Sequence, residues 1–132
     1  MDWEYFNQEI RRLAQTINYR PDIIVGMTRG GVIPARLLAS ELQVEEMFCL
    51  TVRKDGNERK VMTEVLDDLV NEDILLVEDA LESGRSLIVA KRYLESKGAK
   101  VKTASLYYTS VSEITPDFTL QRTDTIPKFP WE

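Results

Sequence analysis

The chain of 132 residues contains no histidine and a single cysteine, Cys49. The missing histidine excludes Ser-His and Cys-His catalysis and most histidine-based metal sites. One cysteine excludes an internal disulfide, and its apolar neighbours indicate a buried thiol rather than a nucleophile. No apolar stretch approaches the length of a membrane span, and the acidic start at residues 1–4 is unlike a signal peptide. We therefore expect a cytoplasmic protein with no membrane partner.

Positive charge is also scarce, because 17 Lys and Arg face 22 Asp and Glu, which gives a net charge of -5. Proteins that bind a nucleic-acid backbone show a basic footprint, so no nucleic-acid partner is expected. A small phosphorylated ligand is still compatible, since it needs only a local positive field. Apolar residues make up 43% of the chain, which suits one globular domain over residues 1–132 with a core of its own.

Strand patterns alternate with helix patterns along the chain. Asp2 suits the N-cap of a first helix, and Gly98 suits the end of the last one. The alternation predicts an α/β fold with a mainly parallel sheet and helices on both faces. Ligands of such sheets bind beyond the carboxyl ends of the strands. The predicted strands cover residues 23–25, 48–52, 61–66, 74–77, 101–108 and 118–121, and the predicted helices cover residues 3–17, 32–42 and 86–97.

One strand end combines two adjacent acids, Glu78 and Asp79, with a short loop that opens a helix. N–H groups at a helix start favour an anion, and Gly84 permits close backbone approach. Ser83 and Ser86 add hydroxyl groups, so the loop suits a phosphate. Carboxylates accept hydrogen bonds from vicinal sugar hydroxyls and attract Mg²⁺. Ribose 5-phosphate satisfies both halves, although acids that merely end a strand and a serine that merely caps a helix would give the same pattern.

A second strand end carries Thr28, Arg29, Gly30 and Gly31. The two glycines let backbone N–H groups converge on anionic oxygens. Arg29 offers a planar fork of donors to a phosphate. The alternative is a tight strand-to-helix turn with a solvated arginine.

The run from residue 78 to residue 86 resembles the signature of the type I phosphoribosyltransferases. That signature is two acids, two mostly apolar residues, an acid and then Thr-Gly-x-Thr. The chain departs from it with Glu82 in place of Asp and with Ser83 and Ser86 in place of Thr. The resemblance spans nearly the whole chain, and the loop at residues 28–31 and the Pro-Trp-acid tail are similar to small bacterial and archaeal xanthine-guanine (hypoxanthine) phosphoribosyltransferases.

The resemblance implies a type I fold with a lid at residues 53–60, a short C-terminal hood and a cis peptide between Thr28 and Arg29. For the lid, a solvated hairpin tip is the alternative. It also implies Mg²⁺-dependent transfer of ribose 5-phosphate from 5-phosphoribosyl-1-pyrophosphate (PRPP) to a nucleobase nitrogen in purine salvage, with pyrophosphate as product, and we expect a homodimer or homotetramer. The implied roles are Glu78 and Asp79 for ribose and Mg²⁺, Glu82, Ser83, Gly84, Arg85 and Ser86 for the 5′-phosphate, Thr28, Arg29, Gly30 and Gly31 for pyrophosphate, and Arg29 and Glu82 for catalysis.

The base pocket departs from the family pattern. Thr109 stands where purine-specific relatives have a lysine, and Ile126 stands where they have a stacking aromatic ring. Two alternatives follow: a non-catalytic regulatory module that binds PRPP or a nucleotide, and a transferase for a non-purine base. The acid at Glu82, placed to accept a proton, favours the enzyme.

Overall fold

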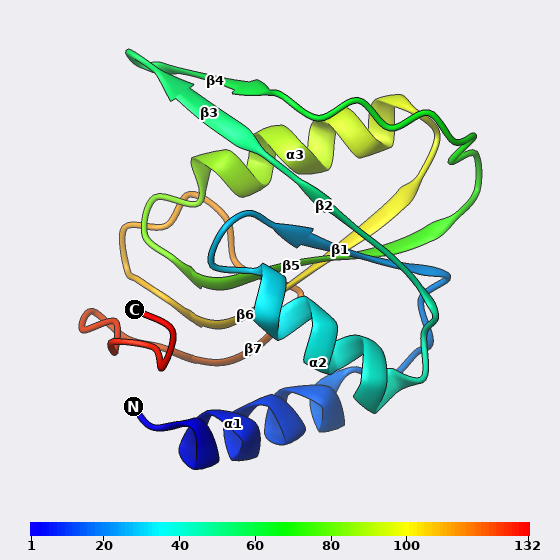
Figure 1. Ribbon diagram of the computed structural model, residues 1–132. Helices are drawn as coiled ribbons and strands as arrows, with labels where there is room; N and C mark the ends of the chain where they lie inside the picture. Colours follow the sequence, from blue (N-terminus) through cyan, green and yellow to red (C-terminus); the bar gives the residue numbers. More distant parts are fainter.

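Five parallel strands form one sheet in the computed structural model, which describes residues 1–132 (Figure 1). The strand order is β2-β1-β5-β6-β7, and every neighbouring pair is parallel. This confirms the predicted α/β class. The central strand is β5, which pairs with β1 on one side and with β6 on the other. The strands are β1 (Ile23–Met27), β2 (Glu46–Leu50), β5 (Asp73–Leu81), β6 (Lys100–Tyr108) and β7 (Phe118–Arg122).

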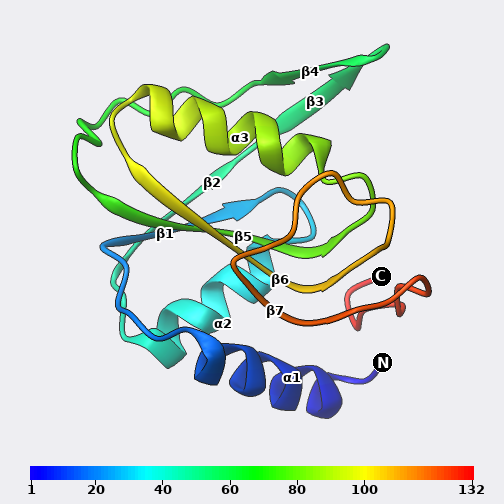
Figure 2. The same cartoon turned by 180° about the vertical axis from the view of Figure 1, so that it is seen from behind.

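The helices cover both faces of the sheet, as predicted. α1 (Trp3–Thr16) and α2 (Val32–Leu42) lie on one face, and α3 (Arg85–Ser96) lies on the other (Figures 1 and 2). The Asp2 carboxylate caps α1 by accepting a hydrogen bond from the Tyr5 N–H at 2.8 Å. Gly98 follows α3 with a φ of 93°, a conformation that favours glycine. No helix is both long and apolar enough to cross a membrane.

The core has two parts because side chains of a strand alternate between its faces. Leu75 and Val77 of β5 pack in the cluster with α1 and α2. Ile74 and Leu76 pack in the cluster with α3. All four are fully buried. The central strand is therefore fixed by packing from both sides as well as by its hydrogen-bonded neighbours.

The predicted strands at residues 48–52 and 61–66 are placed wrongly. β2 ends at Leu50, and a separate antiparallel hairpin follows, formed by β3 (Val52–Asp55) and β4 (Glu58–Val61). Most of residues 61–66 is irregular chain. The N–H of Val65 bonds to the hydroxyl of Tyr93 at 2.9 Å rather than to another strand. Its apolar side chain is buried against α3, so burial produced the strand-like pattern.

The tail at residues 123–132 folds back over the sheet end near α1, which matches the expected hood (Figure 1). Phe129 is buried and stacks on Trp131 with ring centroids 5.0 Å apart. Trp131 in turn meets Phe6 of α1 edge-on at 4.9 Å. The aromatic pair therefore anchors the hood on the body and places Glu132 beside the carboxyl end of β5.

Candidate active site

The acid pair lies within β5 itself, not beyond it. The predicted strand stops at residue 77, but β5 continues to Leu81, and Glu78 pairs in register with Ser105 of β6. Strand propensity disfavours acids, so the sequence pattern ends early. The sheet overrides that preference because β6 supplies pairing partners for Glu78, Ala80 and Leu81, on either side of Asp79. Glu78 and Asp79 are thus held on a strand rather than on a loop.

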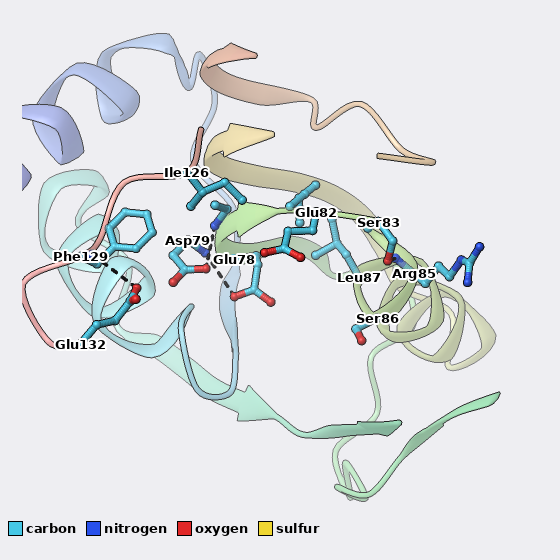
Figure 3. Close-up of a pocket in the computed structure, with 13 residues that line it drawn as sticks. Glu78, Asp79, Glu82, Ser83, Arg85, Ser86, Leu87, Ile126, Phe129 and Glu132 are labelled. Atoms are coloured by element: carbon cyan, nitrogen blue, oxygen red, sulfur yellow. Dashed lines mark hydrogen bonds between the residues drawn. The ribbon is translucent and has the colours of Figure 1, made fainter. Parts of the chain in front are cut away.

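Asp79 packs directly against the loop that follows β1. A Cβ atom on Gly30 would lie 2.3 Å from Asp79 Oδ2, so any side chain at position 30 would displace the Asp79 carboxylate. The Asp79 Oδ1 atom accepts a hydrogen bond from the Ala80 N–H at 2.6 Å, and Glu78 Oε1 accepts one from the Asp79 N–H at 3.2 Å. Figure 3 shows the two carboxylates side by side on the wall of one cavity, with Glu82 next to them.

Neither carboxylate of the pair has a cationic partner. Burial raises the pKa of Glu78 well above its ordinary value, and the neighbouring Asp79 charge raises it further. Burial likewise raises the pKa of Asp79, and Glu132 adds to the effect. A cation or a set of hydroxyl donors between these groups would favour their charged forms. The free site is therefore electrostatically suited to such a ligand.

The loop after β5 presents unused backbone donors at the start of α3. Gly84 is the N-cap residue, has a φ of 75° and provides no side-chain cap. A Cβ there would lie 2.7 Å from Ile114 Cγ2. Ser83 does not cap the helix in the usual way, since its Oγ only accepts a long 3.3 Å hydrogen bond from the N–H of Arg85. The N–H groups that find no acceptor within the chain belong to Ser83, Gly84, Ser86 and Leu87.

The residue Arg85 lines the cavity of the acid pair, but its guanidinium points away from this loop (Figure 3). Its guanidinium forms two hydrogen bonds to the Glu113 carboxylate, at 2.9 and 3.2 Å. Figure 3 shows the side chain directed outward, away from the acids. The pairing with Arg85 lowers the pKa of Glu113. The free positive charge near the loop therefore has another origin.

That charge is Arg59, on β4 of the hairpin. Its Nε donates to Ser86 Oγ at 3.2 Å, and it forms no salt bridge. Arg59 is half-buried, whereas its neighbours Glu58 and Lys60 are exposed. A cation beside a helix N-terminus is unfavourable unless an anion lies between them. One side chain of the hairpin, Arg59, thus reaches the helix-start loop, while residues 53–58 are exposed to solvent.

The loop after β1 offers a second set of donors. The N–H groups of Arg29 and Gly30 have no acceptor in the chain, but that of Gly31 donates to the Met27 carbonyl at 2.8 Å. Gly31 therefore shapes the turn and does not contribute a donor. The hydroxyl of Thr28 bonds to that of Thr51 at 2.9 Å, and the Thr28–Arg29 peptide is cis, as the resemblance implies. Arg29 is exposed and lines a cavity of about 730 Å³ with Glu78, Asp79 and Glu132.

The expected base-pocket residues lie on a neighbouring cavity of about 620 Å³. Glu82 and Ile126 line both this cavity and the one of about 320 Å³ that contains the acid pair. Thr109 is 9% exposed and uses its hydroxyl to donate to the Glu82 carbonyl at 2.9 Å. The predicted residues thus line three neighbouring cavities: Glu82 lines the first two, and the acid pair lines the cavity of about 320 Å³ and the cavity of about 730 Å³ that contains Arg29.

Comparison with known proteins decides the family. The family described as "Phosphoribosyl transferase domain" matches residues 2–132. The chain belongs to the phosphoribosyltransferase family. It is 27% identical, over 100% of its length and 85% of the relative's, to a xanthine-guanine phosphoribosyltransferase of Idiomarina loihiensis.

Solved structures agree with this assignment. A purine phosphoribosyltransferase from Pyrococcus horikoshii superposes with a TM-score of 0.92 at 29% identity, covering 100% of this chain and 91% of that one. For a xanthine-guanine-hypoxanthine phosphoribosyltransferase from Helicobacter pylori the TM-score is 0.85 at 23% identity, with coverage of 99% and 90%. The latter likeness concerns the fold alone.

A divalent cation fits the acid pair of this phosphoribosyltransferase, but only with help from a substrate. No group of three or more His, Cys, Asp or Glu side chains is arranged to hold a metal. Mg²⁺ characteristically binds through one or two carboxylates, together with water and substrate phosphates. Glu78 and Asp79 supply that number of carboxylates, and both also line the cavity that contains Arg29.

Several site residues were missed from the sequence. Arg59 and Glu113 act on the helix-start loop from distant positions, Asp124 and Ser110 complete the second cavity, and Glu132 lies beside the acid pair. Only Glu132 carried a sequence signal, because it closes the Pro-Trp-acid tail. The other contacts join residues far apart in sequence.

We predict that Glu78→Gln stabilises the ligand-free protein at neutral pH. Folding raises the pKa of Glu78, so the neutral carboxyl favours the native state below the unfolded pKa, and this stability is lost as pH rises through the folded pKa. Glutamine cannot ionise, so this loss of unfolding free energy does not occur in the variant. Each kcal/mol gained adds about 3–5 °C to the melting temperature of a chain of this size. Thermal unfolding in a chelating buffer at several pH values would measure it.

The difference in melting temperature between Glu78→Gln and wild type should shrink as pH falls, because the wild-type carboxyl then becomes neutral as well. Exposed Glu64→Gln serves as the matched control and should change the melting temperature little at any pH. A Glu78→Gln protein that melts at a lower temperature than wild type at pH 8 would contradict the prediction.

Proposed function

We propose that this phosphoribosyltransferase transfers ribose 5-phosphate from PRPP to a ring nitrogen of a purine base and releases pyrophosphate, as in purine salvage. The observation that carries the proposal is the acid pair between two loops with unused N–H donors, at the ends of the adjacent strands β5 and β1. The whole-length likeness to purine phosphoribosyltransferases supports a purine as acceptor.

The two loops suit the two charged ends of the donor. The N–H groups before α3 receive the 5′-phosphate, because a helix start favours an anion. The acid pair receives the ribose hydroxyls, which donate to carboxylate oxygens. The N–H groups of Arg29 and Gly30 and the Arg29 guanidinium receive the pyrophosphate. Each part of PRPP thus meets a group of complementary hydrogen-bonding character.

In the reaction the bond between C1 and the pyrophosphate oxygen breaks, and a bond between C1 and the base nitrogen forms. Pyrophosphate leaves with the electron pair, and the base nitrogen loses its proton. Arg29 stabilises the departing negative charge, and a bound Mg²⁺ would supply further charge neutralisation. Glu78 and Asp79 align C1 with the attacking nitrogen by holding the ribose.

Glu82 is the residue placed to accept the proton. It follows β5 directly, is exposed to solvent, and lies where the ribose cavity and the second cavity meet. The base nitrogen that attacks C1 must pass through this junction. No histidine is present in the chain to compete for the role.

The hairpin of β3 and β4 is proposed as the lid. Water competes with the base for C1, so a cover over the donor is useful. Arg59 already reaches Ser86 at the phosphate loop, and a phosphate at the start of α3 would lie between two positive groups. The guanidinium would then bind the phosphate by charge-assisted hydrogen bonds.

The proposal predicts that PRPP binds far better with Mg²⁺ than in a chelating buffer, because Glu78 and Asp79 need a cation to carry full charge beside pyrophosphate. Isothermal titration calorimetry under both conditions measures this, and no binding under either one refutes the proposal.

Pyrophosphate release is then assayed with guanine, hypoxanthine, xanthine, adenine and uracil. The base-side changes at Thr109 and Ile126 favour a regulatory module instead, and donor binding without release for any base would support that module.

Glu82→Gln should lower turnover by roughly 10²–10⁴-fold, the usual range for loss of a general base. Donor binding should be nearly unchanged, because the ribose and phosphate contacts remain. Steady-state kinetics and donor calorimetry would separate the two effects. Glu95→Gln, at an exposed position in the last turn of α3, is the control, and wild-type turnover in Glu82→Gln would remove Glu82 from the mechanism.

Arg59→Ala should raise the KM for PRPP on the order of tenfold, since a hydrogen bond to a charged group contributes about 1.5–3 kcal/mol. Turnover at saturating donor should change much less. Lys60→Ala is the matched control, because it removes the same charge from the exposed face of the same strand. An equal rise of KM in both variants would show that only the net charge of the hairpin matters.

A further inference from the structure

The second cavity is built from the ends of β6 and β7 and adjoins the ribose cavity through Glu82 and Ile126. Its volume of about 620 Å³ lies within the range of small-ligand sites. A base joined to C1 of a ribose on Glu78 and Asp79 would enter it past Glu82. The lining residues are Glu82, Thr109, Ser110, Val111, Asp124, Thr125 and Ile126.

The Thr109 hydroxyl and the Asp124 carboxylate in this cavity are already engaged within the chain. Thr109 Oγ1 donates to the Glu82 carbonyl at 2.9 Å. The Ser110 N–H donates to Asp124 Oδ1 at 3.1 Å, and this hydrogen bond lowers the pKa of Asp124. Each hydroxyl that has given its proton retains only acceptor lone pairs. Thr109 and Asp124 therefore offer a ligand acceptors, whereas the Thr125 hydroxyl can donate or accept.

The charges of the lining have one sign. Glu82 and Asp124 supply two carboxylates, and no lysine or arginine lines the cavity. Arg122 lies close enough to Asp124 to help lower its pKa, but its side chain is not part of the lining. The backbone N–H groups of Val111 and Ile126 have no acceptor in the chain. They can donate to an unprotonated ring nitrogen or to an exocyclic oxygen, so by themselves they do not favour an amino group.

We propose that this cavity selects a base whose exocyclic group is an amino donor, of the adenine type, over a base with an oxo group at that place. An amino group donates to the carboxylates and hydroxyl lone pairs. An oxo group would set its lone pairs against the charge of two carboxylates, and the donors left to pair with it, such as the N–H groups of Val111 and Ile126, are neutral. The inference rests on the proposed function, because it takes the ribose cavity as given.

Binding of nucleoside 5′-monophosphates tests the inference without requiring turnover. Adenosine and inosine 5′-monophosphate share the ribose 5-phosphate and differ at the exocyclic group and the adjacent ring nitrogen. Calorimetry should show the adenosine compound binding at least about tenfold more tightly, which corresponds to about 1.4 kcal/mol. Adenine should likewise exceed hypoxanthine at least about tenfold in kcat/KM, by the same conversion.

Equal or tighter binding of the inosine compound would overturn the inference while leaving the proposed function intact. If neither nucleotide nor PRPP binds, the proposed function fails and the inference fails with it. Thr109→Lys places an ammonium in the cavity and should shift the preference toward the inosine compound. Because Thr109 is buried, Ser110→Lys at an exposed position is the second variant, with the same expected shift even if the first does not fold.

Asp124→Asn should narrow the preference, since its amide supplies a donor while its oxygen still accepts from the Ser110 N–H. Asp67→Asn is the control: Asp67 is exposed, lies outside the cavity, and its side chain forms no hydrogen bond. A wild-type preference in Thr109→Lys and Ser110→Lys, with circular dichroism showing both folded, would overturn the role of the cavity.

Discussion

Two carboxylates held on the central strand without a cation impose the constraint around which the rest of the site is arranged. Glu78 and Asp79 cannot move away, because β5 pairs with β6 through this region and is packed on both faces. Partial burial raises the pKa of both groups. Holding them there costs stability in the free protein, a pattern typical of sites whose charge is completed by a ligand. Gly30 follows from the same constraint, since the Asp79 carboxylate occupies the space of its Cβ.

The loop before α3 has the opposite electrostatic character to the acid pair, because it presents free N–H donors. The two groups also lie at separate places in the site. Acids and phosphate-binding donors would compete for the same ligand atoms if they overlapped. Here the acids belong to the strand and the free N–H groups to the loop before α3, so a ligand can present hydroxyls to one and phosphate to the other. Glu113 engages Arg85 outside the loop, which leaves Arg59 as the cation that faces it.

Features set by local chemistry were predictable from the sequence. The helix N-cap at Asp2, the glycine after α3 and the parallel alternation of strands follow from neighbouring residues and are present in the fold. The runs at residues 28–31 and 78–86 were readable for the same reason. Contacts between distant residues were not. Arg59 meets Ser86 across 27 positions and Ser110 meets Asp124 across 14, and nothing in either residue's surroundings specifies the partner.

The wrong strand at residues 61–66 and the strand that was ended too early at residue 77 have a common physical source. In both, the burial of side chains did not match the presence of a strand. Residues 61–66 gave a strand-like pattern because Val65 is buried as irregular chain, with its N–H satisfied by Tyr93. The strand β5 continues through Glu78 and Asp79, but acids are unusual in a strand, so the pattern ended before them. These two acids line a cavity and not the core. In both cases the polarity of a side chain follows from whether it is buried or faces a site, and not from the hydrogen bonds of its backbone. Strand boundaries inferred from polarity alone were therefore wrong here.

The donor and acceptor halves of the site are held by different parts of the fold, and this explains how one could change without the other. The donor half rests on β5, α3 and the loop before α2, where small changes would disturb the core. The wall beside Ile126 is formed by the hood, which is anchored through Phe129 and Trp131 to α1. Residues 109, 110, 124 and 126 lie on connecting chain outside the helices and strands. Ser110 and Asp124 are exposed, so substitutions there alter the hydrogen bonds offered to a base at little cost in stability, whereas Thr109 is buried and Ile126 packs against the core.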